Sequence, residues 1–296
     1  MPCPPVTVVT PSLNQGEFIG ETLRSVLGQD YPDLECVVVD GGSTDGTLDI
    51  LRDHAGRYPG RLTWTSAPDR GQSEALNKGF RRARGQILGW LNADDVYAQG
   101  AIRAAVGAFA ESPGAALVYG RARFIGAGGE DLGPYPVIAP FTWQGLAEQC
   151  YICQPAAFIR RQPLLESGLL DEGLHSCMDY DLWIRLGRRG EVRFIDAELA
   201  TQRMHEGSKT FLARQQMFAE AFLVVKRHYG YVPLSWCYTY AQFRRYGTAR
   251  SLAPLALDGR VKSLGRLLFV RHNLARPGYV LTAFRERLRA KGADRV

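Results

Sequence analysis

Hydrophobic and polar positions follow two alternating periods along the first hundred residues. Short continuous apolar runs are each followed by a segment whose apolar side chains recur at helical spacing, as at Ile19, Leu23 and Leu27. The pattern predicts strands and helices in strict alternation, at 5–10, 18–29, 34–39, 47–58, 61–67, 73–84 and 86–91. Continuous apolar strands separated by helices are typical of a parallel sheet that helices cover on both faces. We therefore expect an α/β fold on a mostly parallel sheet flanked by helices.

The remaining residues follow a less regular pattern. It predicts helices at 101–110 and 210–229, strands at 116–120 and 194–200, and a loop rich in glycine and proline at 126–140. The long helix is interrupted at Gly230, where the charge of the chain also changes sign. We therefore expect one large domain over 1–230 and a basic, helical C-terminal extension over 231–296.

Charge is distributed unevenly between the two parts. Residues 226–296 carry 15 Lys and Arg against 3 Asp and Glu, a net charge of +12, whereas the whole chain carries +6. The preceding residues are therefore mildly acidic, at −6. A basic segment with interleaved aromatic side chains predicts contact with an anionic membrane surface, and the alternative is a solvated helical appendage. No groove-reading or RNA-binding motif occurs, so nucleic acid is not an expected partner.

Composition narrows the class of protein. Hydrophobic residues make up 46% and charged residues 22%, proportions typical of globular domains. There is no apolar run of about 18 residues and no basic-then-apolar leader, so we expect neither a membrane-spanning helix nor a signal peptide. The expected location is the cytoplasm, with peripheral contact at the inner face of the cytoplasmic membrane. A single C-x-x-C, formed by Cys150 and Cys153, predicts packed thiols rather than a metal site.

Polar clusters follow four of the predicted strands. They are Thr10 to Asn14, Asp40 to Gly46, Asp69 to Gln72, and Asn92 to Asp95. The carboxyl ends of parallel strands meet at one edge of a sheet, where α/β proteins bind ligands. Carboxylates, amides and glycines gathered there predict a cleft for a nucleotide and a divalent cation.

Two of these clusters suggest specific roles. Asp94 and Asp95 are adjacent carboxylates after an apolar run, and Mg²⁺ or Mn²⁺ bound to a diphosphate prefers such oxygen ligands. Asp40 is suited to an N–H donor of a base, and Gly41 permits close backbone approach. The alternatives are a helix cap or turn at Asp40 and a solvated turn at 94–95. No Walker or G-x-G-x-x-G pattern is present, which disfavours kinases and NAD-dependent dehydrogenases.

Taken in order, these motifs resemble those of family 2 glycosyltransferases with the GT-A fold. The N-terminal half of that family is matched by VVTPSLNQGEFIGETLRSVLGQDYPDLECVVVDGGSTDGTLDIL (8–51), DRGQSEALNKGF (69–80) and GWLNADDVY (89–97). Its later motifs are matched by CMDYDLWIRL (177–186) and RMHEGSKT (203–210), so the resemblance covers roughly residues 5–225. It implies a metal-dependent, inverting hexosyl- or N-acetylhexosaminyltransferase. The donor would be a nucleotide-diphosphate sugar, a UDP-sugar first, and the acceptor a glycan or lipid-linked intermediate of cell-surface polysaccharide synthesis.

The resemblance also assigns residues to the donor. It implies that the nucleobase is bordered by Thr10, Pro11, Ser12 and Asn14, that Asp40 and Gly41 contact the base, and that Arg70 lies near the base or diphosphate. Residues 92–95 take the place of the metal-binding D-x-D element, so Asp94 would face the ribose or the metal and Asp95 would hold Mn²⁺ or Mg²⁺. His205 would be a metal ligand or a diphosphate contact. The first position of the element is often Asp and is Asn92 here, which lowers the charge by one.

For the catalytic base the resemblance implies Asp179, which matches the aspartate of an E-D motif whose glutamate is replaced by Met178. Asp181 is the second candidate, and the alternative role for Asp179 is that of a helix N-cap. Gln154 matches a segment that borders the acceptor. Two other classes stay open, a sugar nucleotidyltransferase and a nucleotide-sugar-binding module without catalysis. TPSLNQGEF lacks the Gly-rich, Arg- and Lys-bearing loop of the first, and the two aspartates disfavour the second.

Overall fold

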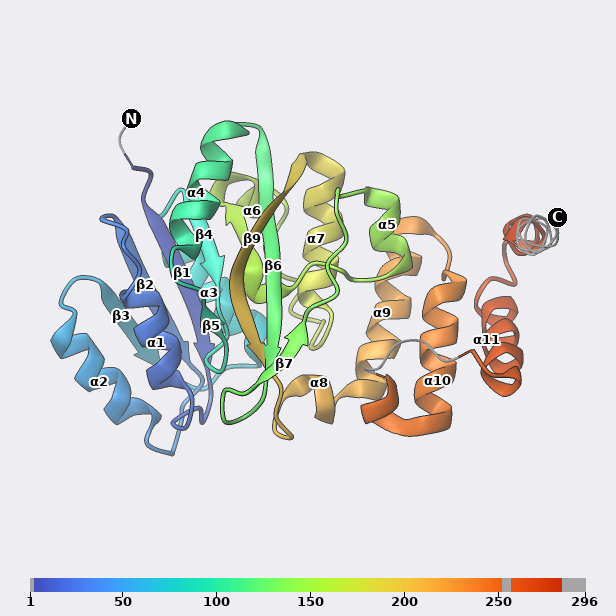
Figure 1. Ribbon diagram of the computed structural model, residues 1–296, viewed down its shortest axis with the longest axis horizontal. Coiled ribbons are helices and arrows are strands. Elements are labelled where there is room, and N and C mark those ends of the chain that lie inside the picture. The colour runs from blue at the N-terminus through green and yellow to red at the C-terminus, as the bar shows by residue number, and fades with distance from the viewer. Residues whose placement is uncertain (1–2, 252–256, 284–296) are drawn as a thin grey trace. The chain divides into compact units, whose positions relative to one another are not determined.

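A mixed sheet of nine strands forms the centre of the first part of the chain (Figure 1). The structure is a computed structural model and describes residues 3–251 and 257–283. The strands are β1 Val6–Ser12, β2 Leu34–Asp40, β3 Leu62–Ser66, β4 Ile87–Trp90, β5 Val96–Tyr97, β6 Ala115–Ile125, β7 Asp131–Pro134, β8 Ala157–Arg160 and β9 Glu191–Arg203. The helices around them are α1 Ile19–Leu27, α2 Thr47–Arg57, α3 Gln72–Arg82, α4 Ala101–Glu111, the short 3-10 helix η1 Gln154–Ala156, α6 Arg161–Glu166 and α7 Met178–Arg189.

The strand order is β3-β2-β1-β4-β8-β6-β9-β5, and β7 pairs with β6. β1 runs parallel to β2 and β4, and β2 runs parallel to β3. Beyond β4 the sheet is mixed, because β8 is antiparallel to β4 and β6, and β5 is antiparallel to β9. The predicted α/β fold is confirmed as a curled mixed sheet flanked by helices.

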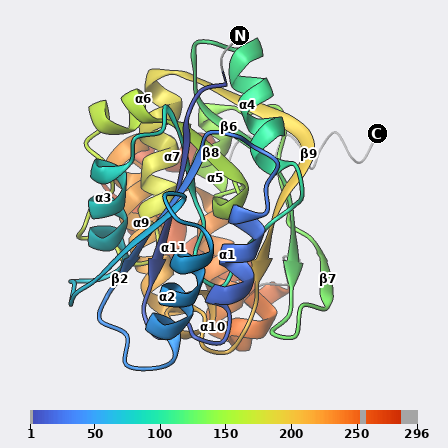
Figure 2. The same ribbon diagram turned by 90° about the vertical axis from the view of Figure 1, so that its left-hand side faces the viewer.

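Helices cover both faces of the parallel half because its strands are apolar on both faces. In β2, Cys36 and Val38 belong to the main core, which includes residues of α1. The alternate residues Val37 and Val39 pack instead with Ala75 of α3. Figure 2 shows α1 and α2 on one side of these strands and α3 on the other. In β1, β2 and β4 this layering leaves the strand ends to present polar groups, whereas β3 at the edge of the sheet also exposes Thr63 and Thr65.

Three segments depart from the elements that the sequence predicts. The expected loop at 126–140 contains β7, because Gly129 at a φ of 88° permits a tight antiparallel return to β6. The strands at 116–120 and 194–200 are the central parts of β6 and β9, which pair along their length. The helix at 210–229 is divided at Ala213, whose ψ of 25° leaves the helical range.

The second compact unit consists of residues 144–149 and 209–296, so the first comprises 1–143 and 150–208. Its helices are α5 Trp143–Glu148, which enters it at Gln144, α8 Lys209–Leu212, α9 Arg214–Tyr229, α10 Leu234–Ser251 and α11 Gly259–His272. The division falls after Ser208 and not at 230, because Phe218 of α9 packs against Trp236, Tyr240 and Phe243 of α10. None of the described helices is long and apolar enough to cross a membrane.

Candidate functional site

The carboxyl ends of β1, β2 and β3 lie side by side. Ser12, Asp40 and Ser66 are in register across these strands. The Gly41 N–H donates to the Ser12 carbonyl at 2.8 Å, and the Ala67 N–H donates to the Asp40 carbonyl at 3.0 Å. Polar clusters from three loops therefore meet at one edge of the sheet, as the strand order requires.

Asp40 is buried, and protein donors occupy its carboxylate. It accepts hydrogen bonds from the hydroxyls of Ser43 and Ser66 and from the backbone N–H groups of Gly42 and Ser43. Burial opposes the charge, but these donors outweigh it and hold the pKa of Asp40 below its ordinary value. Asp40 therefore shapes the turn at Gly42 and Ser43, whereas the sequence predicts direct contact between its carboxylate and a base.

The loops after β1 and β2 are joined by hydrogen bonds between side chains and backbone. Asn14, at a φ of 51°, accepts from the Thr44 N–H through Oδ1 at 2.8 Å, and its own N–H donates to Ser43 Oγ at 2.7 Å. Between the same two loops, the Gly16 N–H donates to Asp45 Oδ2 at 2.9 Å. The Asn14 amide oxygen therefore joins the two loops, and the place of Asn14 beside a nucleobase stays a prediction.

Three other residues expected beside the nucleobase are buried. Thr10 and Pro11 are buried within β1. Ser12 is buried at the strand end, and its Oγ has no hydrogen-bond partner among the described residues. A Cβ added to Gly41 would lie 3.0 Å from Asp69 Oδ2, so a larger residue here would require this half-buried carboxylate to shift. Asp69 belongs to a predicted cluster, but no individual role was predicted for it.

Asp94 and His205 face each other at the same end of the sheet. His205 Nε2 lies 3.1 Å from Asp94 Oδ2, and the two side chains are 15% and 19% exposed. The imidazole also packs on the Phe18 ring, with 4.9 Å between ring centroids. Two motifs separated by 111 residues are therefore brought together, and their shared role at a metal stays a prediction.

Arg203, at the end of β9, fixes the loop that carries Asp94. Its backbone N–H donates to Asp95 Oδ1 at 2.9 Å, and its Nε donates to the Asp94 carbonyl at 2.9 Å. Nη2 donates to Glu21 Oε2 at 2.7 Å, and the residue is only 3% exposed. Arg203 was not among the predicted site residues, although the RMHEGSKT motif begins with it. It sets the position of the Asp94 loop relative to His205, two residues further on.

Asp95 points into the protein. It is 2% exposed, and its Oδ2 accepts from Asn92 Nδ2 at 3.1 Å while Arg203 occupies Oδ1. Burial, and then the charge of Asp94, raises the pKa of Asp95 well above its ordinary value. The geometry thus differs from the predicted division of roles within this pair. Asp95 ties the loop to β9, and Asp94 is the carboxylate that faces outward.

Asn92 joins four neighbours through one amide group. Its Oδ1 accepts from Gln72 Nε2 at 2.7 Å and from Trp90 Nε1 at 2.9 Å. Its Nδ2 donates to Asp95 Oδ2 and to Gln154 Oε1, the latter at 2.9 Å. The amide therefore uses all of its hydrogen-bonding capacity within the protein. Gln154, which the sequence associates with the acceptor, is buried in this hub, and its Nε2 donates to the Trp90 carbonyl at 2.6 Å.

The pair of Asp94 and His205 suits a divalent cation by its chemistry. A carboxylate oxygen and an imidazole nitrogen are both ligands for Mn²⁺, and a carboxylate combined with phosphate oxygens is a usual ligand set for Mg²⁺. Among the described residues no group of three or more His, Cys, Asp or Glu side chains could hold a metal ion. A cation at this pair would therefore take its other ligands from a diphosphate or from water.

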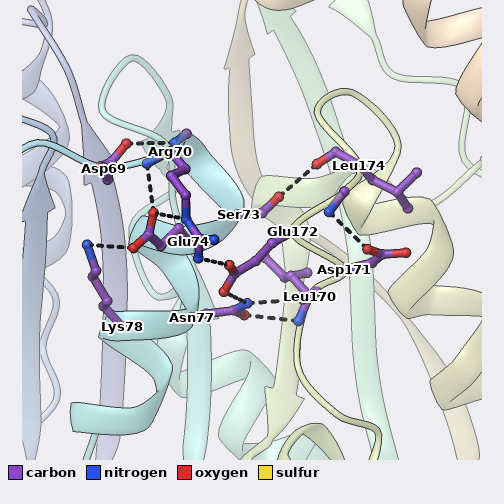
Figure 3. A network of polar contacts seen from close by, with 12 residues as sticks. Asp69, Arg70, Ser73, Glu74, Asn77, Lys78, Leu170, Asp171, Glu172 and Leu174 are labelled. Atoms are coloured by element: carbon purple, nitrogen blue, oxygen red, sulfur yellow. Dashed lines mark hydrogen bonds and ion pairs between the residues drawn. The ribbon is translucent and has the colours of Figure 1, made fainter.

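Arg70 belongs to a polar network between α3 and the segment that leads to α7 (Figure 3). Its Nε donates to Glu74 Oε2 at 3.0 Å, and its Nη2 donates to Glu172 Oε2 at 2.6 Å. In the same network, Ser73 Oγ donates to the Leu174 carbonyl at 2.9 Å. The Arg70 side chain is 78% exposed, so its charge stays accessible to an anion in spite of these two carboxylates.

Asp181, the second candidate for the catalytic base, is buried in an ion pair that stabilises the fold. It is 1% exposed, and Arg185 Nε donates to its Oδ2 at 2.7 Å. The Arg185 guanidinium also donates to the carbonyls of Ser167 and Leu169, both at 2.7 Å. The Leu169 φ of 65° is unusual for a residue other than glycine. Asp181 therefore holds an arginine that fixes a constrained turn.

Asp179, the first candidate, lies half-buried in the first turn of α7. Cys177 is the N-cap of that helix, so Asp179 does not occupy the capping position that was the alternative for it. Burial, and then the charges of Asp95 and Asp179, raises the pKa of the Cys153 thiol well above its ordinary value. The charges of both carboxylates therefore act on one buried thiol. Cys150 and Cys153 are free thiols.

Comparison with known proteins identifies relatives of the sequence. A family model described as glycosyl transferase family 2 matches residues 7–169. Chondroitin synthase of Escherichia coli is 27% identical over 214 residues, which cover 71% of this chain and 30% of that protein. The chain spans about a third of the length of this and other curated relatives that it matches.

Two solved structures share the fold. Residues 1–349 of Staphylococcus aureus TarS, in complex with UDP-GlcNAc, align with a TM-score of 0.64 and 16% identity, covering 88% of this chain and 78% of that one. The mannosyltransferase PcManGT of Pyrobaculum calidifontis, in complex with GDP-Man and Mn²⁺, aligns with a TM-score of 0.62 and 22% identity, covering 97% and 81%. At these identities the likeness confirms the predicted GT-A type of fold.

Proposed function

The chain belongs to glycosyl transferase family 2, and on that premise we propose that it transfers a sugar from a nucleotide-diphosphate sugar to an acceptor hydroxyl with inversion at the anomeric carbon. A UDP-sugar is the first candidate donor. The observation that carries the proposal is the contact between Asp94 and His205, 3.1 Å apart and partly exposed beside the carboxyl ends of the strands. A buried arginine, Arg203, holds the Asp94 loop at this place.

The nucleoside end of the donor is assigned to the edge formed by β1 and β2. Ser12 Oγ is buried without a partner among the described residues, and Gly41 leaves backbone and the Asp69 carboxylate accessible to a ring N–H donor. Asp40 stabilises this edge through the hydrogen bonds that it accepts from the Ser43 and Ser66 hydroxyls. The exposed guanidinium of Arg70 is suited to a diphosphate oxygen, because Arg presents donors in a fixed fork.

Asp94 and His205 would hold Mn²⁺ or Mg²⁺. When bound, the metal would stabilise the negative charge of the leaving diphosphate. Asp179 is assigned as the base: its carboxylate accepts the proton of the acceptor hydroxyl as that oxygen bonds to the anomeric carbon. The bond from the anomeric carbon to the diphosphate breaks on the opposite face, and the nucleoside diphosphate leaves. Asp181 is engaged by Arg185 and takes no part in this step.

The acceptor is proposed to be a glycan or a lipid-linked glycan intermediate, and the pathway cell-surface polysaccharide synthesis. The support for this is family membership together with the likeness to a chondroitin synthase over 71% of this chain. The sugar transferred is proposed to be a hexose or an N-acetylhexosamine.

Calorimetric titration of UDP, with and without Mn²⁺, tests the proposal. We expect Mn²⁺-dependent binding in the wild type, loss of that dependence in Asp94→Ala, and retention in the control Asp49→Ala, whose carboxylate is 82% exposed on α2. If UDP does not bind, GDP and dTDP are titrated in the same way. Absence of Mn²⁺-dependent binding with all three nucleotides, or equal binding by the Asp94→Ala protein, contradicts the proposal.

A further inference from the structure

The outward face of α11 carries a narrow ridge of small and aliphatic side chains, of which Leu267 is the exposed large one, with cations on both sides. With about 3.6 residues per turn, Ser263, Leu267 and Val270 project in neighbouring directions from this helix. Leu267 is 66% exposed, an unusual position for a large aliphatic side chain between charged residues. Lys262 and Arg266 lie on one side of the ridge, and Arg260 and Arg271 on the other; all four are exposed.

The opposite face of α11 is already used for folding. Val261, Gly265 and Phe269 are buried, and α11 packs on α10. An added Cβ at Gly265 would lie 2.2 Å from Tyr238 Cδ1, so the two helices are in direct contact there. The outward ridge is therefore not part of the apolar surface that this unit buries in its own core.

The cations of this face have no acidic partner among the described residues. Asp258 is the one acidic residue between positions 226 and 283 of the sequence. Its carboxylate accepts from the Tyr246 hydroxyl, caps the helix at the Val261 N–H at 2.8 Å, and pairs with Arg245 at 3.2 Å. The Tyr246 hydrogen bond, followed by these other contacts, lowers the pKa of Asp258 to about 2. It is thus committed to Arg245 and the helix cap, and the four cations stay available.

We propose that this face of α11 docks on the surface of an anionic lipid bilayer. Cations on both sides of the ridge would meet lipid phosphates, while their long aliphatic stems allow the ridge between them to reach the acyl boundary. A nucleic acid would satisfy the cations but offers no apolar phase for an exposed Leu267 between them. The proposal goes beyond sugar transfer, and it would bring the enzyme to a lipid-linked acceptor.

Co-sedimentation with vesicles tests the proposal without any measurement of activity. Vesicles of equal parts phosphatidylcholine and phosphatidylglycerol are compared with vesicles of phosphatidylcholine alone. The double variant Arg266→Gln/Arg271→Gln should bind the anionic vesicles about 25-fold more weakly, at about fivefold per cation. Leu267→Ser should also weaken binding, but without changing its dependence on salt.

The matched control is Arg52→Gln/Arg57→Gln, which removes two cations that are 60% and 67% exposed on α2 of the first unit. We expect this control to bind as the wild type does, and circular dichroism to show all variants folded. Absence of wild-type binding, equal binding to both kinds of vesicle, or equal loss in the control would overturn the proposal. Tighter binding of the wild type to a single-stranded oligonucleotide, lost in the α11 variant, would overturn it in favour of nucleic acid.

Discussion

Asn77 and Leu170, 93 residues apart in sequence, exchange a pair of hydrogen bonds. The Asn77 amide donates to the Leu170 carbonyl and accepts from the Leu170 N–H, both at 3.0 Å (Figure 3). Its Nδ2 also donates to Glu172 Oε1 at 3.0 Å. The Asn77 side chain thus satisfies both backbone groups of Leu170, as a neighbouring strand would in a sheet. It joins the segment ahead of α7 to α3.

Asn77→Ala should be strongly destabilising. The change leaves the buried N–H and carbonyl of Leu170 without this partner, and unsatisfied buried groups cost about 1–3 kcal/mol each. We expect urea unfolding to show a loss of about 2–4 kcal/mol. The control is the adjacent Lys78→Ala, whose partly exposed pair with Glu74 is worth about 1 kcal/mol. Equal losses for the two variants would show that the Asn77 bonds contribute little.

Asn92→Asp should destabilise the protein although it restores the commoner residue of the metal-binding element. Aspartate cannot donate to Gln154 Oε1, and it would set a second carboxylate against Asp95 Oδ2, now 3.1 Å from the amide nitrogen. We expect a loss of about 2–4 kcal/mol in urea unfolding. The control Asn14→Asp keeps the oxygen that accepts from Thr44 and should change stability by less than about 1 kcal/mol. An unchanged midpoint for Asn92→Asp would disprove the importance of the donated bonds.

Asp179→Asn and Asp181→Asn should have different effects. Loss of a positioned base lowers turnover by about 10²–10⁴, so Asp179→Asn should reduce kcat by that factor and leave nucleotide affinity and unfolding near wild type. Asp181→Asn removes the charge that neutralises Arg185 and should cost about 3 kcal/mol in unfolding. Transfer kinetics and urea unfolding on both variants separate the two roles. A stable Asp181→Asn protein without turnover would move the base to Asp181.

Asp40 should contribute a pH-dependent part of the stability. Its pKa is lowered in the folded protein, so the unfolded chain binds the proton more tightly. The contribution is complete above the ordinary aspartate pKa of about 3.9 and is lost as the pH falls through the lowered folded value. The difference in unfolding free energy between wild type and Asp40→Asn should therefore be largest near neutral pH and shrink on acidification below about pH 4.

Unfolding measured over a pH series checks this expectation. Ser66→Ala offers an independent variant, because it removes one of the donors that lower the pKa of Asp40. Ser66→Ala should bring the folded pKa of Asp40 closer to its ordinary value. The pH range over which the Asp40 contribution to stability is lost should then be narrower. A wild-type curve parallel to that of Asp40→Asn throughout the series would show that the carboxylate contributes no such dependence.

The parallel half of the fold could be predicted from the sequence because its strands are buried on both faces and leave continuous apolar runs. The choice between Asp94 and Asp95 could not. Neighbouring residues of a loop point in different directions, and the direction of Asp95 is set by the backbone of Arg203, 108 residues further on. Asp40 is a similar case, because its role depends on the Ser66 hydroxyl at the end of another strand. The resemblance predicted which segments meet at the candidate site, and long-range hydrogen bonds decide which of their atoms face outward.

The four-way amide at Asn92 has an evolutionary consequence. Its partners Trp90 and Asp95 lie in the same segment, and Gln72 and Gln154 lie 20 and 62 residues away in sequence. Each partner requires either a donor or an acceptor from the amide. Substitutions at these positions should therefore be epistatic. In a library of second-site revertants of Asn92→Asp, suppressors should concentrate at 154 and 95, where a changed side chain can donate to the carboxylate oxygen that replaces the amide nitrogen. We therefore expect Asn92 and its four partners to change together, and not one at a time, among related proteins.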